Sequence, residues 1–377
     1  MTALALALGA AALAFAAWSY AVYPLLIRRL AARAAPLPFA ADPAPASIEV
    51  IVSAADEEAV IGARVRDLLA QRVAGRYRIA IGCDGSTDGT EAEARRALGD
   101  GGRVVAFPAR RGKASVLNDL VAASDADLLV FTDANTLFEP GAVAALARAL
   151  DGPVTGAVCG RLVLEPAGGP GTPESAFWDR ETQLKEAEGR LGVCLGANGA
   201  IYAARRREIE PLATDTTSMD DFLIPARIAR RGFRVVFAGN AVARERAARD
   251  VRAEMPRRFR IGVGAGQVLR REPWLLAAWR HPLLSLTFVS RKAARWLAPV
   301  LALAGAALGL TSSPVAPWSA AALAAAAVFV AAALVRPRLP GLPGRLYYFV
   351  VMNLALAAGV VAGLFGYSRA AWKPTGR

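Results

Sequence analysis

Short apolar runs and longer amphipathic segments alternate over residues 48–237, and their lengths separate strands from helices. The runs that predict strands are 48–52, 79–83, 103–107, 127–132 and 235–237. The segments whose apolar positions recur with helical spacing are 59–71, 90–98, 114–123, 142–150, 174–190 and 222–231. This alternation predicts an α/β fold in which helices cover both faces of a parallel sheet.

Three stretches interrupt the pattern. Residues 36–47 are rich in Pro and Ala and predict a linker, and residues 165–173 are rich in Gly and Pro and predict a loop. Residues 196–202 predict a glycine turn that leads into a strand.

The two ends of the chain are apolar over much longer distances. Residues 2–27, 297–335 and 346–368 contain no charged side chain. A helix rises about 1.5 Å per residue, so each run can cross a hydrocarbon core about 30 Å thick. The TSSP sequence at 311–314 splits the middle run into a hairpin, so we expect one membrane helix before the polar region and three after it. The alternative for the first run, a cleaved signal peptide, is disfavoured by its uncharged start and its length.

The basic residues gather beside these apolar runs, and the formal net charge of the chain is +13. The clusters are Arg28, Arg29 and Arg33; Arg291, Lys292 and Arg295; and Arg336, Arg338 and Arg345. The positive-inside rule puts such clusters, and the region 28–295, in the cytosol. Nucleic-acid binding is the alternative, but it does not explain why the charge lies next to apolar runs. The basic tail 369–377 would lie outside after four spans, so it conflicts with that span count.

Cysteine and histidine usage limits the chemistry. The three cysteines have no CxxC spacing, which disfavours a zinc site or a disulfide framework. The single histidine, His281, directly precedes a proline near the apolar C-terminal region. Acid–base chemistry is therefore expected from carboxylates.

Asp84 begins the sequence DGSTDGT at 84–90, directly after a predicted strand. Ligands of open α/β sheets bind at the carboxyl ends of the strands. A carboxylate there can accept a hydrogen bond from an imide N–H or a ribose hydroxyl, and the Ser and Thr residues can cap the next helix. The segment predicts nucleotide binding, with a simple capped turn as the alternative.

A second carboxylate, Asp133, ends the strand predicted at 127–132, and Asn135 follows two residues later. Hard divalent cations take oxygen ligands and often bridge a carboxylate and a diphosphate. Asp133 and Asn135 are therefore candidate ligands for Mg²⁺ or Mn²⁺, with a helix cap as the alternative.

Three groups later in the chain are candidates for the remaining roles. Asp220 and Asp221 suit a general base with a supporting neighbour, or a double N-cap. The RRFR segment at 257–260 could clamp a diphosphate or bind anionic lipid. Trp178 and Glu181 could stack on and hydrogen-bond to an acceptor sugar, although Trp178 equally suits a core position.

In this order, the features resemble the membrane-bound family 2 glycosyltransferases, the group that includes cellulose and hyaluronan synthases. The resemblance runs from about Ile48 to Trp296. The segments that carry it are AADEE at 54–58, DGSTDGT at 84–90, GKA at 112–114 with LN at 117–118, Asp133, Asp220 with Asp221, and RRFRI at 257–261. In the first of these, Asp56 replaces the Asn of the family's NEE turn.

The resemblance implies a role for each candidate residue. It assigns the general base to Asp221, with Asp220 beside it, and the metal to Asp133 and Asn135. The residues implied in nucleotide binding are Ala54, Asp56, Glu57, Asp84, Ser86, Lys113 and Asp133. Diphosphate contacts are implied for Arg257 and Arg260, and acceptor contacts for Trp178, Glu181 and Gly199. Processive members have QxxRW where this chain has RRFRI, and only Arg260 is retained.

The resemblance also implies an architecture: a GT-A, Rossmann-like nucleotide-diphospho-sugar transferase domain flanked by transmembrane helices. The expected parts are a transmembrane helix 1–28, a linker 29–47, a cytosolic GT-A domain 48–280, an interfacial segment 281–296, three transmembrane helices 297–368 and a tail 369–377.

The expected activity is inverting transfer of a sugar from a nucleotide donor, expected to carry UDP, to a lipid-linked or glycan acceptor. We expect Mg²⁺ or Mn²⁺ as cofactor, membrane lipids and no nucleic acid as partners, and a bacterial inner membrane with the catalytic domain on its cytosolic side. The alternatives are a processive polysaccharide synthase and a catalytically inactive membrane scaffold that retains the fold. Nucleotidyl transfer is disfavoured by the membrane runs and by Asp220 with Asp221.

Overall fold

The structure, a computed structural model, describes residues 1–35, 47–165, 173–217, 219–246, 251–312, 314–335 and 341–368. It divides into two compact units. The sheet unit begins at Ile27 and ends at Ala247, and the helical unit comprises Met1–Leu26 and Ala248–Ser368. Residues 251–280, expected in the transferase domain, thus belong to the helical unit. Most of the expected linker, 36–46, and the tail, 369–377, lie outside the described residues.

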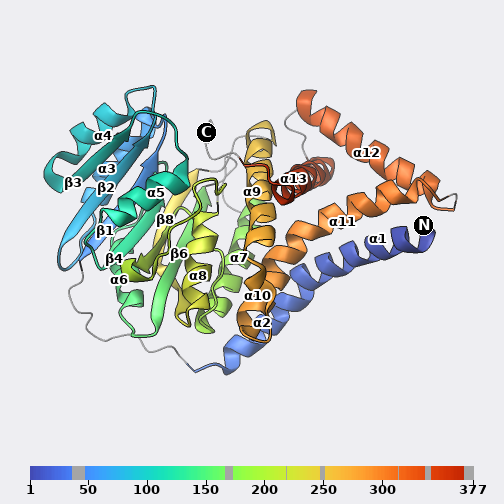
Figure 1. Cartoon of the computed structure of the whole chain (residues 1–377), viewed down its shortest axis with the longest axis horizontal. Coiled ribbons are helices and arrows are strands. Elements are labelled where there is room, and N and C mark those ends of the chain that lie inside the picture. The colour runs from blue at the N-terminus through green and yellow to red at the C-terminus, as the bar shows by residue number, and fades with distance from the viewer. Residues whose placement is uncertain are drawn as a thin grey trace. The chain divides into compact units, whose positions relative to one another are not determined.

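The sheet unit is built on an eight-stranded sheet with the order β3-β2-β1-β4-β7-β6-β8-β5 (Figure 1). Its strands are β1 (Ile48–Ala54), β2 (Tyr77–Asp84), β3 (Gly102–Phe107), β4 (Leu128–Asp133), β5 (Leu137–Phe138), β6 (Thr155–Glu165), β7 (Tyr202–Arg205) and β8 (Arg234–Arg246). The first four strands of that order are parallel to one another, as the alternation predicts.

The other half of the sheet corrects the sequence prediction. β7 runs antiparallel to both β4 and β6, and β5 runs antiparallel to β8. The sequence pattern does not predict β6 or β5 at all. β6 contains Gly156 and Gly160, which interrupt its apolar run and weaken the strand signal. The sheet is therefore mixed. One half is parallel and follows the local pattern, whereas the other half contains antiparallel pairs beside the parallel pair of β6 and β8 and is set by tertiary pairing.

Helices cover both faces of the sheet. Those of the sheet unit are α3 (Glu58–Leu69), α4 (Thr90–Leu98), α5 (Lys113–Ala122), α6 (Ala142–Leu150), α7 (Pro173–Arg190) and α8 (Asp220–Arg230). The core cluster joins alternate residues of β1, such as Val50 and Val52, to Ile61 and Val65 of α3. The opposite face carries α5, since a Cβ placed on Gly82 of β2 would meet a methyl group of Val116 at 2.3 Å.

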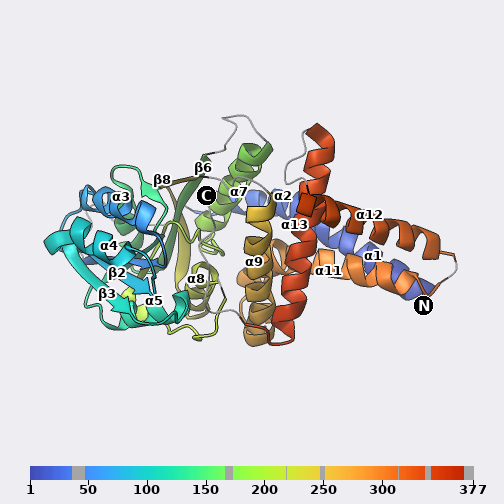
Figure 2. The same cartoon turned by 90° about the horizontal axis from the view of Figure 1, so that it is seen from above.

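The helical unit contains the predicted apolar segments. Its helices are α1 (Thr2–Ala17), α9 (Val251–Arg271), α10 (Pro282–Phe288), α11 (Ala294–Gly309), α12 (Ala316–Val335) and α13 (Gly341–Leu364). Helix α1 continues through Trp18–Val22 into α2 (Tyr23–Arg33), which belongs to the sheet unit from Ile27 onward. Figures 1 and 2 both show α1 beside α11. Hydrogen bonds from Trp18 Nε1 to Ser290 Oγ (2.8 Å) and from Arg295 Nε to Ser19 Oγ (2.9 Å) link the same two parts of the chain.

Fewer helices than expected are suited to crossing a membrane. Among the described residues, two helices are long and apolar enough by length and composition, Thr2–Arg33 and Leu346–Leu364. The apolar part of α12, Ala316–Ala332, is shorter. The hairpin expected at 297–335 forms as α11 and α12, but neither helix reaches the length and apolar character of the other two.

Two helices of the helical unit touch backbone to backbone. Figure 2 shows α9 and α13 side by side. A Cβ on Gly262 would lie 2.3 Å from the Leu356 carbonyl oxygen, and one on Gly359 would lie 2.1 Å from the Phe259 carbonyl oxygen. Each glycine belongs to a GxxxG sequence, 262–266 in α9 and 359–363 in α13. Small residues at this spacing let two helix backbones approach closely.

We expect Gly359→Ala to lower the free energy of unfolding by about 1–3 kcal/mol, because its methyl group would overlap a backbone carbonyl that cannot rotate away. Thermal unfolding of the purified chain measures the change. The matched control is Gly9→Ala in α1, where an added Cβ meets nothing within 4 Å. That control should leave stability unchanged or raise it by up to about 1 kcal/mol. Equal effects of the two substitutions would contradict the close helix contact.

Candidate active site

The two carboxylates predicted from strand ends lie at the same edge of the sheet. Asp84 is the last residue of β2 and Asp133 the last residue of β4. Both strands are parallel neighbours of β1, whose Ser53 is in register with Asp133 and whose Ala54 is in register with Cys83. The carboxyl ends of three parallel strands thus meet, which is where open α/β sheets bind ligands.

The turn after β1 is hydrogen-bonded to the turn after β2. Asp56 has a positive φ of 53°, a conformation that Asp tolerates better than most residues. Its Oδ1 accepts from the Thr87 N–H at 2.8 Å, and Arg110 forms an ion pair with its other oxygen. The Glu57 N–H donates to Thr90 Oγ1 at 2.8 Å. The Thr87 and Arg110 contacts lower the pKa of Asp56 against a smaller opposing effect of burial, so this carboxyl is ionised near neutral pH.

Asp84 is fully buried and holds a loop. Its Oδ1 accepts from the Arg111 N–H at 2.7 Å and its Oδ2 from the Gly112 N–H at 2.9 Å. The loop that it holds leads directly into α5 and Lys113. The half-buried Ser86, also predicted to contact the nucleotide, accepts from the Asp56 N–H at 3.3 Å. The structure thus gives Asp84 a loop-anchoring contact, whereas its predicted contact with a nucleotide stays a prediction.

Lys113 joins the carboxylates that follow β4 and begin α8. Its Nζ donates to Asp133 Oδ1 at 3.0 Å and lies 3.2 Å from Asp220 Oδ2. Burial alone would lower the pKa of Lys113, but the charges of Asp133 and Asp220 raise it by more, so the net pKa lies above its ordinary value. Asp220 also accepts from the Tyr202 hydroxyl at 3.2 Å. Burial, together with the Asp220 charge, raises the pKa of Tyr202 and keeps this hydroxyl protonated as a donor.

Asp221 and Asp133 face the same small space beside a glycine. A Cβ on Gly199 would lie 3.6 Å from Asp133 Oδ2 and 3.8 Å from Asp221 Oδ2. The turn that carries Gly199 is tied to α8, since the Ala197 N–H donates to the Asp221 carbonyl at 3.1 Å. The structure therefore brings together four residues predicted from separate segments: Lys113, Asp133, Gly199 and Asp221.

One residue of this region is missed by the sequence patterns. Arg64 of α3 is fully buried, donates from Nη2 to Thr132 Oγ1 at 2.7 Å and stacks over the Phe138 ring. Thr132 in turn donates to the Ala200 carbonyl at 2.7 Å, next to Gly199. Burial lowers the pKa of Arg64 to about 10, partly offset by its ion pair with Asp67, so the side chain stays charged at neutral pH. The sequence signal for Arg64 is its place between the apolar positions of an amphipathic helix.

Other predicted residues lie apart from this group or are described only in part. Asn135 donates from Nδ2 to Glu245 Oε1 at 3.4 Å. Glu181 is half-buried in α7, and Trp178 falls in the first turns of α7, where side chains lie outside the described ones. Arg257 and Arg260 are in α9 of the helical unit, so their contact with a diphosphate stays a prediction. Arg257 Nη1 lies 3.5 Å from Glu254 Oε2.

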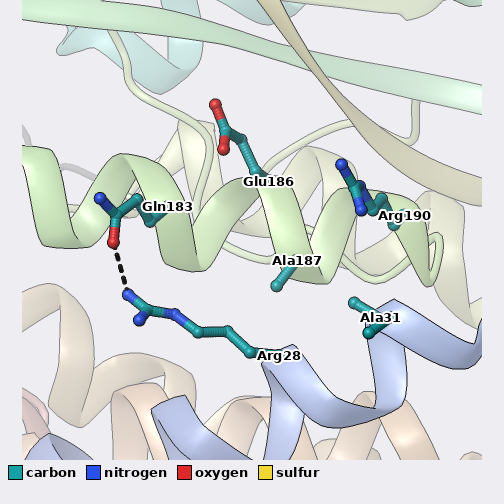
Figure 3. Close-up of a pocket in the computed structure, with 7 residues that line it drawn as sticks. Arg28, Ala31, Gln183, Glu186, Ala187 and Arg190 are labelled. Atoms are coloured by element: carbon teal, nitrogen blue, oxygen red, sulfur yellow. Dashed lines mark hydrogen bonds between the residues drawn. The ribbon is translucent and has the colours of Figure 1, made fainter.

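The sheet unit also contains a cavity of about 270 Å³ between α2 and α7. Figure 3 shows Arg28 reaching along the cavity to donate to Gln183 Oε1 at 2.7 Å, while Glu186 points away from α2. Its lining residues are Arg28, Ala31, Ala32, Gln183, Glu186, Ala187 and Arg190. None of them belongs to the predicted site, which is an open group of side chains at the sheet edge.

The family of the sheet unit follows from a comparison with known protein families. The sequence model of glycosyl transferase family 2 matches residues 49–210, which contain both strand-end carboxylates, Lys113 and Gly199. Residues 49–210 are a glycosyl transferase family 2 domain. The protein is accordingly an enzyme of the glycosyltransferase class.

One solved structure supports a GT-A-like fold for this domain. A mannosyltransferase from Pyrobaculum calidifontis, solved with GDP-mannose and Mn²⁺, is 25% identical, with a TM-score of 0.66 over 95% of this chain and 99% of that one. A second structure, glucosyl-3-phosphoglycerate synthase from Mycobacterium tuberculosis solved with Mn²⁺, UDP and glucosyl-3-phosphoglycerate, is 23% identical over 54% of this chain and 72% of that one, with a TM-score of 0.37. No curated protein matches the chain.

We expect Lys113→Met to lower the free energy of unfolding of the family 2 domain by about 1–3 kcal/mol, because it leaves Asp133 and the buried Asp220 without their shared cation. A lysine whose pKa is raised on folding stabilises fully below its unfolded pKa of about 10.4 and loses that effect as the pH rises through its folded pKa. The difference between wild type and variant should therefore stay constant from about pH 7 to pH 9.

Denaturant unfolding at several pH values measures this difference. The matched control is Arg95→Met in α4, which removes an exposed pair with Glu91 and should change stability by less than about 1 kcal/mol. A Lys113→Met effect that disappears by about pH 9 would contradict the raised pKa.

Proposed function

We propose that this enzyme is an inverting transferase that moves a sugar from a nucleotide donor to an acceptor hydroxyl. The observation that carries the proposal is the convergence of Asp133 and Asp221 on the space beside Gly199. The Asp133 side chain is 40% exposed, so it can meet a ligand, and it lies at the carboxyl edge of the sheet, where nucleotides bind in such folds.

In the proposed reaction, Asp221 takes the proton of the acceptor hydroxyl while the hydroxyl oxygen attacks the anomeric carbon of the donor. The bond between that carbon and the diphosphate oxygen breaks, and the nucleoside diphosphate leaves with the bonding electrons. A single displacement of this kind inverts the configuration at the anomeric carbon. Asp220 supports Asp221 from the adjacent position, because Lys113 and Tyr202 hold its carboxylate in place.

The residues of the site suit a divalent cation that is shared with the donor. Asp133 and Asp220 pair with the ammonium of Lys113, and the carboxylates of Asp133 and Asp221 lie on the same side of Gly199, so several oxygen ligands of the kind that a divalent cation takes lie close together. Within the described residues, no three acidic, His or Cys side chains are grouped to hold a metal by themselves. Asp133 would therefore contribute one oxygen ligand to Mg²⁺ or Mn²⁺, and donor phosphates and water would supply the others. When bound, the metal would neutralise charge on the leaving diphosphate.

For the donor we propose a UDP-sugar, bound over the turns after β1 and β2. The support is the DGSTDGT sequence at 84–90 and its resemblance to a uridine-binding segment. GDP-mannose is the second donor to consider, because the similar mannosyltransferase was solved with it. We further propose single transfers, since Arg257 and Ile261 replace the outer residues of the QxxRW motif of processive enzymes, and assign Arg260 to the departing diphosphate.

We propose a membrane-bound enzyme with a lipid-linked or glycan acceptor. Two helices, Thr2–Arg33 and Leu346–Leu364, have the length and apolar character of membrane spans. Arg28, Arg29 and Arg33 follow the apolar part of the first one, as the positive-inside rule expects on the cytosolic side.

We expect membranes that contain the wild-type protein to release UDP or GDP from a matching nucleotide sugar, only with Mg²⁺ or Mn²⁺ and an acceptor-containing lipid extract. Asp221→Asn should lower the turnover rate by at least about 100-fold, because an amide cannot take the acceptor proton. A screen of UDP-sugars and GDP-mannose, with and without EDTA, measures both effects and identifies the donor.

The matched control for this assay is Asp100→Asn, an exposed aspartate between α4 and β3. It should leave turnover unchanged. Release that persists at the wild-type rate in Asp221→Asn would contradict the role of Asp221, and release that persists in EDTA would contradict the metal.

We expect the full chain to stay with the membrane pellet after an alkaline carbonate wash and to enter the supernatant only with detergent, because apolar helices of this length insert stably. Immunoblotting of the fractions measures this. Release by carbonate alone would contradict membrane insertion while leaving the proposed chemistry in place.

A further inference from the structure

A buried cation lies beneath the site and takes no part in the chemistry described so far. Lys185 of α7 is only 5% exposed. Removing an ammonium from water costs several kcal/mol unless it is well paired, so a buried lysine needs a specific polar partner. Glu188, one turn further along α7, is also fully buried and places a negative charge on the same face of the helix.

The partner of Lys185 is the side chain of Asn198. Lys185 Nζ donates to Asn198 Oδ1 and lies 3.9 Å from Cys159 Sγ of β6. The other end of the same amide, Nδ2, donates to the Gly160 carbonyl at 3.2 Å. A side-chain amide has one favourable orientation when its oxygen accepts from an ammonium and its nitrogen donates to a carbonyl. Lys185 therefore fixes Asn198 between α7 and β6.

Asn198 directly precedes Gly199, the glycine that borders the carboxylates of Asp133 and Asp221. A Cβ on Gly199 would lie 3.6 Å from Asp133 Oδ2 and 3.8 Å from Asp221 Oδ2, so the backbone here forms one wall of the space between them. The far side of the turn is fixed too, because the Ile201 N–H donates to the Asn198 carbonyl at 2.9 Å and the Ala197 N–H donates to the Asp221 carbonyl at 3.1 Å. Lys185 supplies the side-chain contact that holds the middle of this turn.

We propose that Lys185 is a positioning residue for sugar transfer: through Asn198 it holds the Gly199 wall so that an acceptor hydroxyl is placed against Asp221. This inference rests on the proposed function, and it adds a residue that contacts neither donor nor metal. Lys185 acts on the side of the site formed by α7, β6 and α8, whereas the turns proposed to bind the nucleotide follow β1 and β2.

The test compares Lys185→Met with wild type in the full chain. Displacing reacting groups by about 1 Å can cost on the order of 100-fold in rate, so we expect kcat to fall by about 10- to 100-fold. The KM for the nucleotide sugar should stay within about twofold, because the donor contacts are untouched. Lys185→Arg, which can still donate to Asn198, should recover part of the rate. The matched control, Arg190→Met, removes an exposed cation from the same helix and should leave both constants unchanged.

A double-mutant cycle tests whether Lys185 acts on catalysis through Asn198. If Lys185 acts through Asn198, the variant with both Lys185→Met and Asn198→Ala is no slower than the slower of the two single variants. Multiplicative losses, or an unchanged kcat in Lys185→Met, would overturn the proposal. If Lys185→Met does not fold, Lys185→Arg and Asn198→Ala decide: a wild-type kcat in Asn198→Ala overturns it.

Hydrogen exchange separates this proposal from the proposed function. Amides of residues 196–201 should exchange faster in Lys185→Met than in wild type or Arg190→Met, whatever the substrate. Faster exchange in a chain that transfers no sugar would leave Lys185 as the residue that holds the turn and reject the proposed function. Unchanged exchange would overturn the role of Lys185 even if the enzyme is active.

Discussion

The site of this glycosyltransferase is constrained above all by the repulsion among its carboxylates. Asp133, Asp220 and Asp221 come from two segments about ninety residues apart and converge at one edge of the sheet. Lys113 reduces the repulsion between two of them, since its ammonium pairs with both Asp133 and Asp220. The fold must therefore bring the start of α5 to the end of β4 and the start of α8 before the site can exist.

Two buried cations form hydrogen bonds with segments that border these carboxylates. Arg64 reaches from α3 to the end of β4 through Thr132, and Lys185 reaches from α7 to the turn before β7 through Asn198. Each of these side chains costs free energy to bury and is retained in contact with a segment that borders the carboxylates. The edge of the sheet is thus held by hydrogen bonds to buried cations as well as by apolar packing, which suits a site whose atoms have to stay in place while charge moves.

The helical unit depends on a different constraint, the close approach of backbones. The glycines of α9 and α13 leave no space for side chains between the helices, so their contact is set by backbone geometry. This explains why RRFRI at 257–261, read from sequence as part of the transferase domain, belongs to a helix whose main packing partner is α13. The charged residues of α9 lie on a helix that the glycine contact holds in the helical unit.

The sequence by itself determined the parallel half of the sheet, helices α3 to α6 within a few residues, and the strand-end positions of Asp84 and Asp133, because these depend on local hydrophobic period and turn chemistry. It also picked out Lys113, Gly199 and Asp221 through resemblance. Tertiary structure alone decided that β6 joins the sheet, that β7 is antiparallel, that Asp84 is enclosed by the loop before α5, and that Arg64 and Lys185 are buried. Pairing across long sequence distances and the burial of a charge depend on what the rest of the chain places next to a residue, and no local pattern carries that information.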